Sequence, residues 1–98
     1  MFEEKVYRLA KKIPKGKVTT YKLLAKAVGN AKAARAVGNT LNKNPLAPQV
    51  PCHRVVKSDG KLGGFAKGTR KKAEMLKAEG IGIMNGKILD FEKRLFRF

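Results

Sequence analysis

A pair of short helical patterns separated by a tight turn constrains the fold of this 98-residue chain more than any other feature. The first helix is expected over about 21–28, where Thr19 or Thr20 can cap it, and Gly29-Asn30 then ends it. The second helix is expected over about 32–42. Its apolar face consists of Ala33, Val37 and Leu41. Two short helices joined by a tight turn that contains glycine are typical of a helix-turn-helix.

The outer face of the second predicted helix carries cations and amides and no acid. It consists of Lys32, Arg35, Asn39, Asn42 and Lys43. Lys and Arg bind phosphates, while Arg and Asn hydrogen-bond base edges. The chain has 23 Lys and Arg residues against 7 Asp and Glu residues, a formal net charge of +16 that favours a polyanionic partner, above all nucleic acid. We therefore predict that this face binds DNA.

Two ordinary explanations of the positive charge stay open. Any surface helix has a solvated polar face, and some heat-adapted proteins carry a lysine-rich surface. Those surfaces usually gain Glu as well, whereas Glu is scarce in this chain. The composition therefore favours the polyanionic partner.

The only cysteine and the only histidine of the chain are neighbours, in the stretch Pro51-Cys52-His53-Arg54-Val55-Val56. A thiolate is a strong nucleophile, and a nearby imidazole can take the proton of the thiol directly or through a water. The preceding connector over 44–51 holds three of the four prolines, so it is expected to be rigid and to deliver Cys52 at a defined place. The alternative is a small buried cysteine beside a surface histidine.

The remaining patterns predict short helices and strands around this centre. The expected elements are an amphipathic helix with apolar positions from Phe2 to Ile13, a strand over 54–57, a hairpin turn at 58–60 that returns at Lys61-Leu62, a helix over 69–79 capped by Thr69, a second hairpin at Asn85-Gly86, and a tail over 90–98 packed by Phe91, Leu95 and Phe98. A hairpin that follows a helix-turn-helix indicates a wing. We expect a mostly α fold with a small β part, a winged helix-turn-helix-like single domain over residues 1–98.

Several classes of protein are disfavoured by the sequence. No apolar run approaches the ~20 residues of a membrane span, and the N-terminus carries acid where a secretory signal carries base. One cysteine forms no internal disulfide, and with one histidine it builds no zinc site from soft ligands. We expect a reduced, intracellular, soluble monomer without a metal or cofactor.

Taken together, these residues resemble the DNA-binding, catalytic domain of the O6-alkylguanine-DNA alkyltransferases from about Phe2 to Gly80. The stretch Pro51-Cys52-His53-Arg54-Val55-Val56 looks like the active-site motif of that family without change. Residues 32–38 and Asn44-Pro45 match its recognition helix and hinge. The family repairs O6-alkylguanine in double-stranded DNA by irreversible transfer of the alkyl group to its own cysteine. The resemblance thus implies a methylated-DNA–protein-cysteine methyltransferase that reacts once.

The resemblance also implies roles for individual residues. Cys52 is expected to be the nucleophile and acceptor, and His53 the base that acts through a water. Glu79 is expected to orient His53, although it could instead be a surface residue at a helix end. Asn44 is expected at the hinge near the cysteine. Tyr21 is expected to hydrogen-bond the flipped guanine and rotate its phosphate, with a core aromatic residue as the alternative.

Chemistry on a base of a duplex requires that the base be flipped out of the stack. Arg35 resembles the finger that fills the vacated stack. The other expected DNA contacts are Lys32, Asn39, Asn42, Lys43 and Thr20. The expected substrate pocket consists of the backbone of Cys52 and Val55, the N–H of Ala66, and the side chains of Phe65, Leu41 and Ala47.

The chain departs from the family pattern in two respects. Ala47 stands where proline is frequent, which bears on the size of the alkyl pocket. Many members carry an additional N-terminal domain, whereas this chain begins at the catalytic domain, as do alkyltransferase-like proteins that usually replace the cysteine with Trp and bind lesions without transfer. Three interpretations stay open, an alkyltransferase, a non-catalytic lesion-binding protein and a plain winged-helix regulator, with a cysteine hydrolase as a distant fourth. Adjacent Cys and His favour the first.

Overall fold

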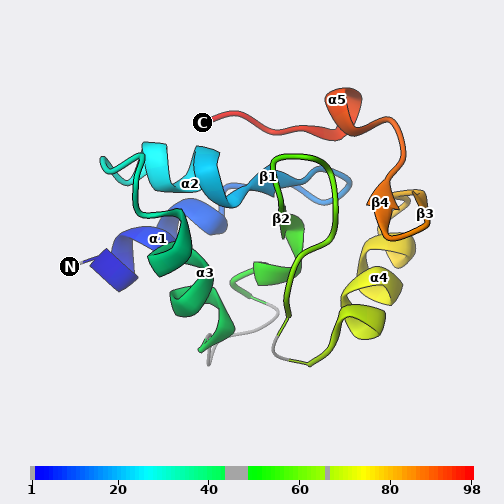
Figure 1. Ribbon diagram of the computed structural model, residues 1–98, viewed down its shortest axis with the longest axis horizontal. Helices are drawn as coiled ribbons and strands as arrows, with labels where there is room; N and C mark the ends of the chain where they lie inside the picture. The colour runs from blue at the N-terminus through cyan, green and yellow to red at the C-terminus, as the bar shows by residue number, and fades with distance from the viewer. Residues whose placement is uncertain (1, 44–48, 66) are drawn as a thin grey trace.

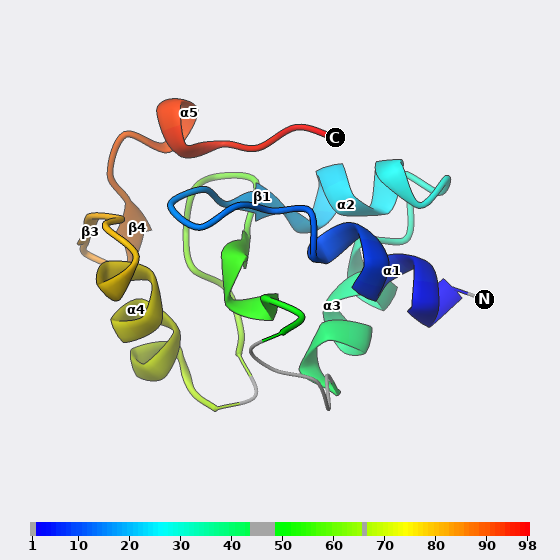
Figure 2. The ribbon, with the colours of Figure 1, turned by 180° about the vertical axis from the view of Figure 1, so that it is seen from behind.

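The computed structural model describes residues 2–43, 49–65 and 67–98 (Figure 1). The elements are α1 (Phe2–Ala10), β1 (Thr19–Thr20), α2 (Tyr21–Ala27), α3 (Ala34–Asn42), the 3-10 helix η1 (Cys52–Arg54), β2 (Val55–Val56), α4 (Thr69–Ala78), β3 (Ile83–Met84), β4 (Lys87–Ile88) and α5 (Phe91–Arg94). In both views α1, α2 and α3 gather on one side, and α4 lies with the β3–β4 hairpin on the other (Figures 1 and 2). The expectation of a mostly α fold with a small β part is confirmed.

The helix-turn-helix is formed by α2 and α3. The side chain of Thr20 caps α2, because its Oγ1 accepts the backbone N–H of Leu23 at 3.0 Å. Gly29 ends the helix region with φ +99°. The second helix begins at Ala34, two residues later than predicted, since the Asn30 side chain accepts the N–H of Lys32 at 3.1 Å and holds these residues in a turn.

Two clusters of buried apolar side chains make up the core. The first lies among α1, α2, α3 and η1 and includes Val6, Leu24, Val37, Leu41, Cys52 and Val55. The second includes Val18, Val56, Leu62, Leu76, Ile81 and Ile88. Successive residues of a strand point to opposite sides, so Val55 enters the first cluster and Val56 the second. The two-residue strand β2 therefore lies between the two halves of the core.

The strand predicted over 54–57 is shorter and has a different partner. It covers Val55–Val56, because the residues before it form η1, and it pairs in parallel with β1. The predicted turn is present, with the N–H of Lys57 donating to the carbonyl of Lys61 at 2.9 Å. Lys61, the first residue after the turn, forms an antiparallel β-bridge with Lys87 of β4, because the next residue, Leu62, is buried in the second cluster. The turn of the wing is thus confirmed, and its return strand pairs elsewhere.

The second predicted hairpin is confirmed as β3–β4. Asn85 and Gly86 form its turn with φ values of +52° and +75°, the left-handed conformation that a two-residue hairpin loop favours. The expected cap at Thr69 differs, because Gly68 occupies the N-cap position without a side-chain hydrogen bond and Thr69 is the first helical residue. Among the residues described here, no helix has the length and apolar character to cross a membrane.

The C-terminal tail crosses back over the molecule to β1 (Figure 2). The N–H of Val18 donates to the carbonyl of Arg94 at 2.9 Å, and the N–H of Phe96 donates to the carbonyl of Val18 at 2.7 Å. The predicted common face of Phe91, Leu95 and Phe98 is wrong for Phe98. Backbone beyond α5 is extended, so Phe98 lies on the side of Phe96, edge-to-face at 5.1 Å, and is 43% exposed.

Arg94 joins three segments that are distant in sequence. Its Nη1 donates to the carbonyl of Gly16 at 3.2 Å, and its Nη2 donates to the carbonyl of Gly80 at 3.2 Å. The loop after α1 is thereby fixed to the residue that follows Glu79. Hydrogen bonds from a charged donor contribute more than neutral ones, so this side chain is expected to stabilise the arrangement.

Replacement of Arg94 by alanine should lower the free energy of unfolding by about 1–2 kcal/mol, because two charge-assisted hydrogen bonds are lost at partly exposed positions. Thermal unfolding followed by circular dichroism should show a Tm lower by about 4–15 °C. The matched control is Arg97→Ala, which removes an exposed guanidinium whose ion pair is with the exposed Glu92. Equal Tm values for the two variants would contradict the stabilising role assigned to Arg94.

Candidate active site

The cysteine lies in a short 3-10 turn at the edge of the first core cluster. The N–H of Cys52 donates to the carbonyl of Val50 at 2.8 Å, and the N–H of Arg54 donates to the carbonyl of Pro51 at 3.0 Å. These bonds and the restricted φ of the proline fix the backbone of η1. The Cys52 residue is 8% exposed, so packing holds it while a small part of its surface meets solvent.

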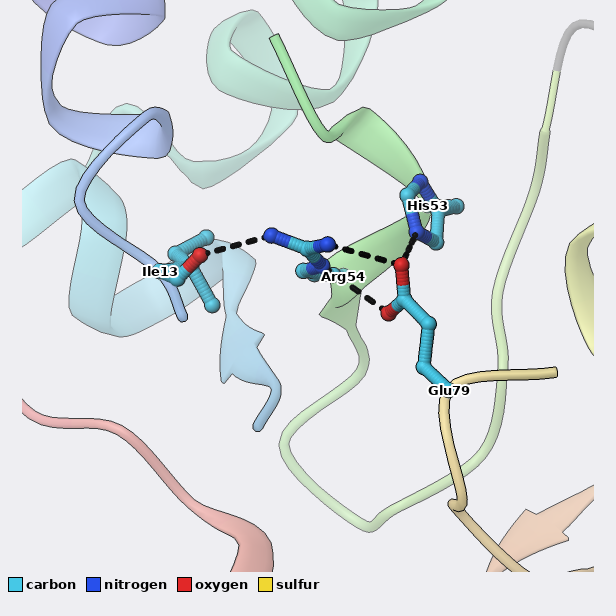
Figure 3. Close-up of polar contacts among 4 residues, drawn as sticks. All are labelled: Ile13, His53, Arg54 and Glu79. Carbon is cyan, nitrogen blue, oxygen red and sulfur yellow. Dashed lines mark hydrogen bonds and ion pairs between the residues drawn. The ribbon is translucent and has the colours of Figure 1, made fainter. Parts of the chain in front are cut away.

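Glu79 accepts hydrogen bonds from two side chains of η1 (Figure 3). His53 Nε2 lies 3.0 Å from Glu79 Oε2. The guanidinium of Arg54 donates Nε to Oε1 at 2.9 Å and Nη2 to Oε2 at 2.7 Å, a bidentate pair. Its Nη1 donates to the carbonyl of Ile13 at 2.8 Å, which ties the carboxylate to the loop after α1. The structure thus brings Glu79 to His53, and it adds Arg54, for which the sequence indicated no role.

The directions of the pKa shifts of Glu79 and His53 indicate which of the two side chains is charged. Burial raises the pKa of Glu79, but the hydrogen bonds from Arg54 and His53 together outweigh it and hold that pKa below its ordinary value. Burial lowers the pKa of His53 by more than the neighbouring carboxylate restores. At neutral pH we therefore infer an ionised Glu79 and a neutral imidazole. Because Nε2 faces a carboxylate, it carries the ring proton, and Nδ1 has the free lone pair.

Within the described part of the chain, His53 Nδ1 is the buried side-chain polar atom without a hydrogen-bond partner. His53 is 2% exposed, so this acceptor is sheltered from bulk water. An imidazole held from behind by a carboxylate, with its second nitrogen deprotonated, has the arrangement of a general base. Its neighbour in the chain is Cys52, which suits proton transfer from the thiol directly or through one water.

A fully buried lysine organises the other side of the site. Lys72 of α4 is 0% exposed, and its Nζ donates to the carbonyls of Val55 at 2.6 Å and Leu62 at 2.5 Å. It also donates to the carbonyl of Gly64 at 3.2 Å and to the hydroxyl of Tyr21 at 3.3 Å. The ammonium thus joins β2, the 62–64 loop and α2. None of the four oxygens belongs to a carboxylate, and burial lowers the pKa of Lys72 to about 8.

Sequence reasoning missed Lys72 because it follows Arg70 and Lys71, and such a run is usually a solvated face. A signal was present in its spacing. Lys72 precedes the buried Leu76 by four residues, which places both on the same face of α4. A lone cation on an apolar helix face, in a chain with few acids, indicates carbonyl partners.

Tyr21 lies between the lysine and the helix-turn-helix. Its hydroxyl donates to the carbonyl of Gly64 at 3.3 Å, and burial, with a smaller effect of charge on Cys52, raises its pKa. Its ring fits closely against Gly63, where an added Cβ would lie 3.2 Å from Tyr21 Cε2 and where φ is +75°. Glycine is therefore required at this approach. The phenol stays protonated at neutral pH.

A hollow of about 460 Å³ opens between α3 and the 63–64 loop. Its lining includes four predicted site residues, Tyr21, Arg35, Asn39 and Asn42, together with Lys57. Lys32 and Lys43 are exposed near the two ends of α3 but do not line it. Thr20 is buried and uses its hydroxyl as the cap of α2.

Three other predicted site residues lie in or beside the first core cluster. Leu41 and Val55 are buried, and Phe65 is partly buried against the cluster. The carbonyl of Val55 already accepts from Lys72, which leaves one lone pair for a ligand. Asn44, Ala47 and Ala66 lie outside the described residues. Among the residues described, no group of three or more His, Cys, Asp or Glu side chains could hold a metal ion.

Comparison with known proteins agrees with this geometry. Residues 1–81 match the model of the 6-O-methylguanine DNA methyltransferase, DNA binding domain. The chain belongs to this family. A methylated-DNA–protein-cysteine methyltransferase of Methanosarcina acetivorans is 49% identical over 79 residues, which are 81% of this chain and 51% of that protein. The Escherichia coli bifunctional transcriptional activator/DNA repair enzyme Ada is 42% identical over 78 residues, 80% of this chain and 22% of that protein.

Solved structures similar to this chain include complexes with DNA. Atl1 of S. pombe, in complex with damaged DNA containing O6-carboxymethylguanine, matches with a TM-score of 0.88 at 31% identity and covers 99% of this chain and 95% of its own. Mycobacterium tuberculosis OGT in complex with DNA matches with a TM-score of 0.78 at 39% identity, over 81% of this chain and 48% of its own. The chain thus spans about half the length of the methyltransferases it matches and nearly all of Atl1.

Replacement of Glu79 by glutamine should lower the reactivity of Cys52. The amide no longer fixes the proton on His53 Nε2 and gives less support to an imidazolium, so the base is weakened. We expect the rate of carboxamidomethylation by iodoacetamide at pH 7, measured by intact mass, to fall on the order of 10- to 100-fold. The matched control is Glu74→Gln, which changes an exposed side chain of α4, the helix that Glu79 directly follows. An unchanged rate in the Glu79 variant would contradict the assigned base.

Replacement of Lys72 by methionine should change the pH dependence of stability. The folded-state pKa of about 8 lies below the ordinary 10.5, so the unfolded chain holds more protons between these values and wild-type stability rises with pH there. Urea unfolding at about pH 7.5 and 9.5 should show the wild type gaining about 2 kcal/mol relative to Lys72→Met. A difference that does not vary with pH would mean that the ammonium is solvated.

Proposed function

We propose that this chain is a methylated-DNA–protein-cysteine methyltransferase. It repairs O6-alkylguanine in double-stranded DNA by irreversible transfer of the alkyl group, chiefly methyl, to Cys52. The observation that carries the proposal is the hydrogen bonding of His53, the residue that follows Cys52. Its Nε2 is bonded to Glu79, which Arg54 also holds, and its buried Nδ1 has no hydrogen-bond partner among the described residues. A lesion-binding protein that does not transfer the alkyl group has no need of such a base.

Binding to DNA is assigned to the exposed face of α3. Its cations neutralise phosphates, and Arg35 fills the stack that the flipped guanine leaves. Lys32, Asn39, Asn42, Lys43 and Thr20 complete the proposed contact surface, with Thr20 acting through its backbone because its side chain caps α2. This assignment is supported by the hollow that Tyr21 lines, because Arg35, Asn39 and Asn42 line it as well.

The transfer step balances within the residues of the site. The proton of Cys52 passes through a water to His53 Nδ1, and the resulting thiolate attacks the carbon attached to O6. The S–C bond forms as the C–O bond breaks, and the released electron pair leaves O6 as a carbonyl with negative charge on the guanine ring. A ring nitrogen then takes up a proton from solvent, and His53 releases the proton of the thiol to solvent. Tyr21, whose raised pKa keeps its phenol protonated, donates a hydrogen bond to the guanine in place of the one to the carbonyl of Gly64. A thioether has no easy hydrolytic exit, so each molecule reacts once.

The remaining assignments belong to the same proposal. Asn44 acts at the hinge, the backbone of Val55 and Ala66 reads the guanine, and Leu41, Ala47 and Phe65 shape the alkyl pocket. The partial burial of Phe65 against the cluster that contains Cys52 supports its place there. Residues 1–98 act as a single domain and a monomer, with no cofactor, in the compartment of the cell that holds DNA.

A second candidate function is lesion binding without transfer. The match to Atl1 favours it, because this chain covers 95% of that protein but only 48% of Mycobacterium tuberculosis OGT. The retained Cys52 and the bonds among His53, Arg54 and Glu79 favour transfer.

Incubation with a duplex that contains O6-methylguanine should make the protein heavier by one methyl group, on the peptide that holds Cys52. Cys52→Ser should show no mass change and retain binding to the methylated duplex, since a hydroxyl is a far weaker nucleophile than a thiolate. His53→Ala should slow the change without moving its site. Preferential binding of methylated duplex with no mass change in the wild type would favour the second candidate.

A further inference from the structure

A second basic depression lies on α2, away from the hollow of α3. Two hollows of about 370 and 300 Å³ separate α2 from the C-terminal tail, and both are lined by Leu23, Lys26 and Arg97, so they form one continuous groove. Figure 1 shows the tail running beside α2 toward the C-terminus. We call this depression the tail groove. Its polar and aromatic lining includes Thr20, Lys22, Lys26, Ser58, Arg97 and Phe98.

The charge of the tail groove is positive. Lys22, Lys26 and Arg97 are exposed cations, and Glu92 is the acid of the lining. The Arg97 Nη2 to Glu92 Oε2 distance is 3.7 Å between two exposed side chains, and such pairs contribute little. Within the described contacts neither lysine has an acidic partner. These cations are therefore available to an anion from outside the chain.

The tail groove and the hollow to which DNA binding is assigned are lined from the same two segments. Tyr21 and Lys57 line that hollow, while their chain neighbours Lys22 and Ser58 line the tail groove. The helix α2 and the turn after β2 therefore each supply side chains to both depressions. A bound duplex extends over many residues, so its backbone can reach both, and Glu92 is the acid that it meets in the lining of the tail groove.

We propose that the tail groove binds the phosphodiester backbone of the DNA duplex on which Cys52 acts, and so extends the contact beyond α3. This rests on the DNA substrate of the proposed function. Lys22, Lys26 and Arg97 neutralise phosphates, and the exposed ring of Phe98, held edge-to-face by Phe96, gives the groove an apolar end against sugar and base. Arg97 and Phe98 follow residue 81, where the family match ends, so this contact is supplied by the tail.

The test compares two double variants that each lose two exposed positive charges. Lys26→Gln with Arg97→Gln alters the tail groove, and Lys71→Gln with Lys77→Gln alters α4 on the other side of the molecule. Binding to a fluorescent duplex is measured by anisotropy over a range of salt concentrations. Loss of two phosphate contacts should reduce the slope of log K against log salt by about 1.8 in the groove variant, and the α4 variant should keep the wild-type slope.

Equal slopes for the groove variant and the wild type, or equal losses in both double variants, would overturn the proposal. Methyl transfer from the same duplex at saturating protein separates this result from the proposed function. Transfer by the wild type with no effect of the groove variant on the slope refutes the groove alone. A reduced slope in the groove variant with no transfer by the wild type supports the groove and refutes the methyltransferase.

Discussion

The Glu79 carboxylate makes the interactions on which the site depends, because it is bonded both to His53, the proposed general base, and to Arg54. Both of its oxygens receive Arg54, and one receives His53. The same guanidinium reaches the carbonyl of Ile13, so the end of α4, the turn of η1 and the loop after α1 are fixed together. Even a partly buried carboxylate is costly unless it is paired and hydrogen-bonded, and here the pairing of Glu79 also sets the tautomer of the imidazole. Stability and chemistry therefore depend on one side chain.

Lys72 plays the corresponding part on the other side of β2. The hydrogen bonds that water would accept from its ammonium are accepted instead by carbonyl oxygens of β2 and the 62–64 loop and by the hydroxyl of Tyr21. The hydrogen bonds of Lys72 and those of Glu79 reach η1 and β2 from opposite ends of α4. Lys72 lies near the start of this helix, and Glu79 directly follows its last residue. A single helix thus positions both His53 and Tyr21. Displacement of α4 would disturb the two side chains, and hence the two roles proposed for them, together.

The sequence predicted the elements whose signals are local. Helical periodicity, the Thr20 cap and the Asn85-Gly86 turn each depend on neighbouring residues, and the structure confirms them. The strand partner of Val55–Val56 was missed because β1 is 36 residues away and only two residues long. Arg54 and Lys72 were missed for a related reason. A charged side chain becomes buried only when remote carbonyls or carboxylates come to meet it, and no window of sequence shows that meeting.

The hydrogen bonds of the tail have a consequence for the order of folding. Thr19 Oγ1 donates to the carbonyl of Phe96 across 77 positions of the chain, whereas α1, α2 and α3 contact one another within the first half. Closing so long a loop costs conformational entropy before any contact compensates for it. The helices can assemble while the chain is still emerging from the ribosome, but β1 cannot receive its second partner until residues 94–96 have left it. The contacts of β1 with the tail therefore form after those among the three helices.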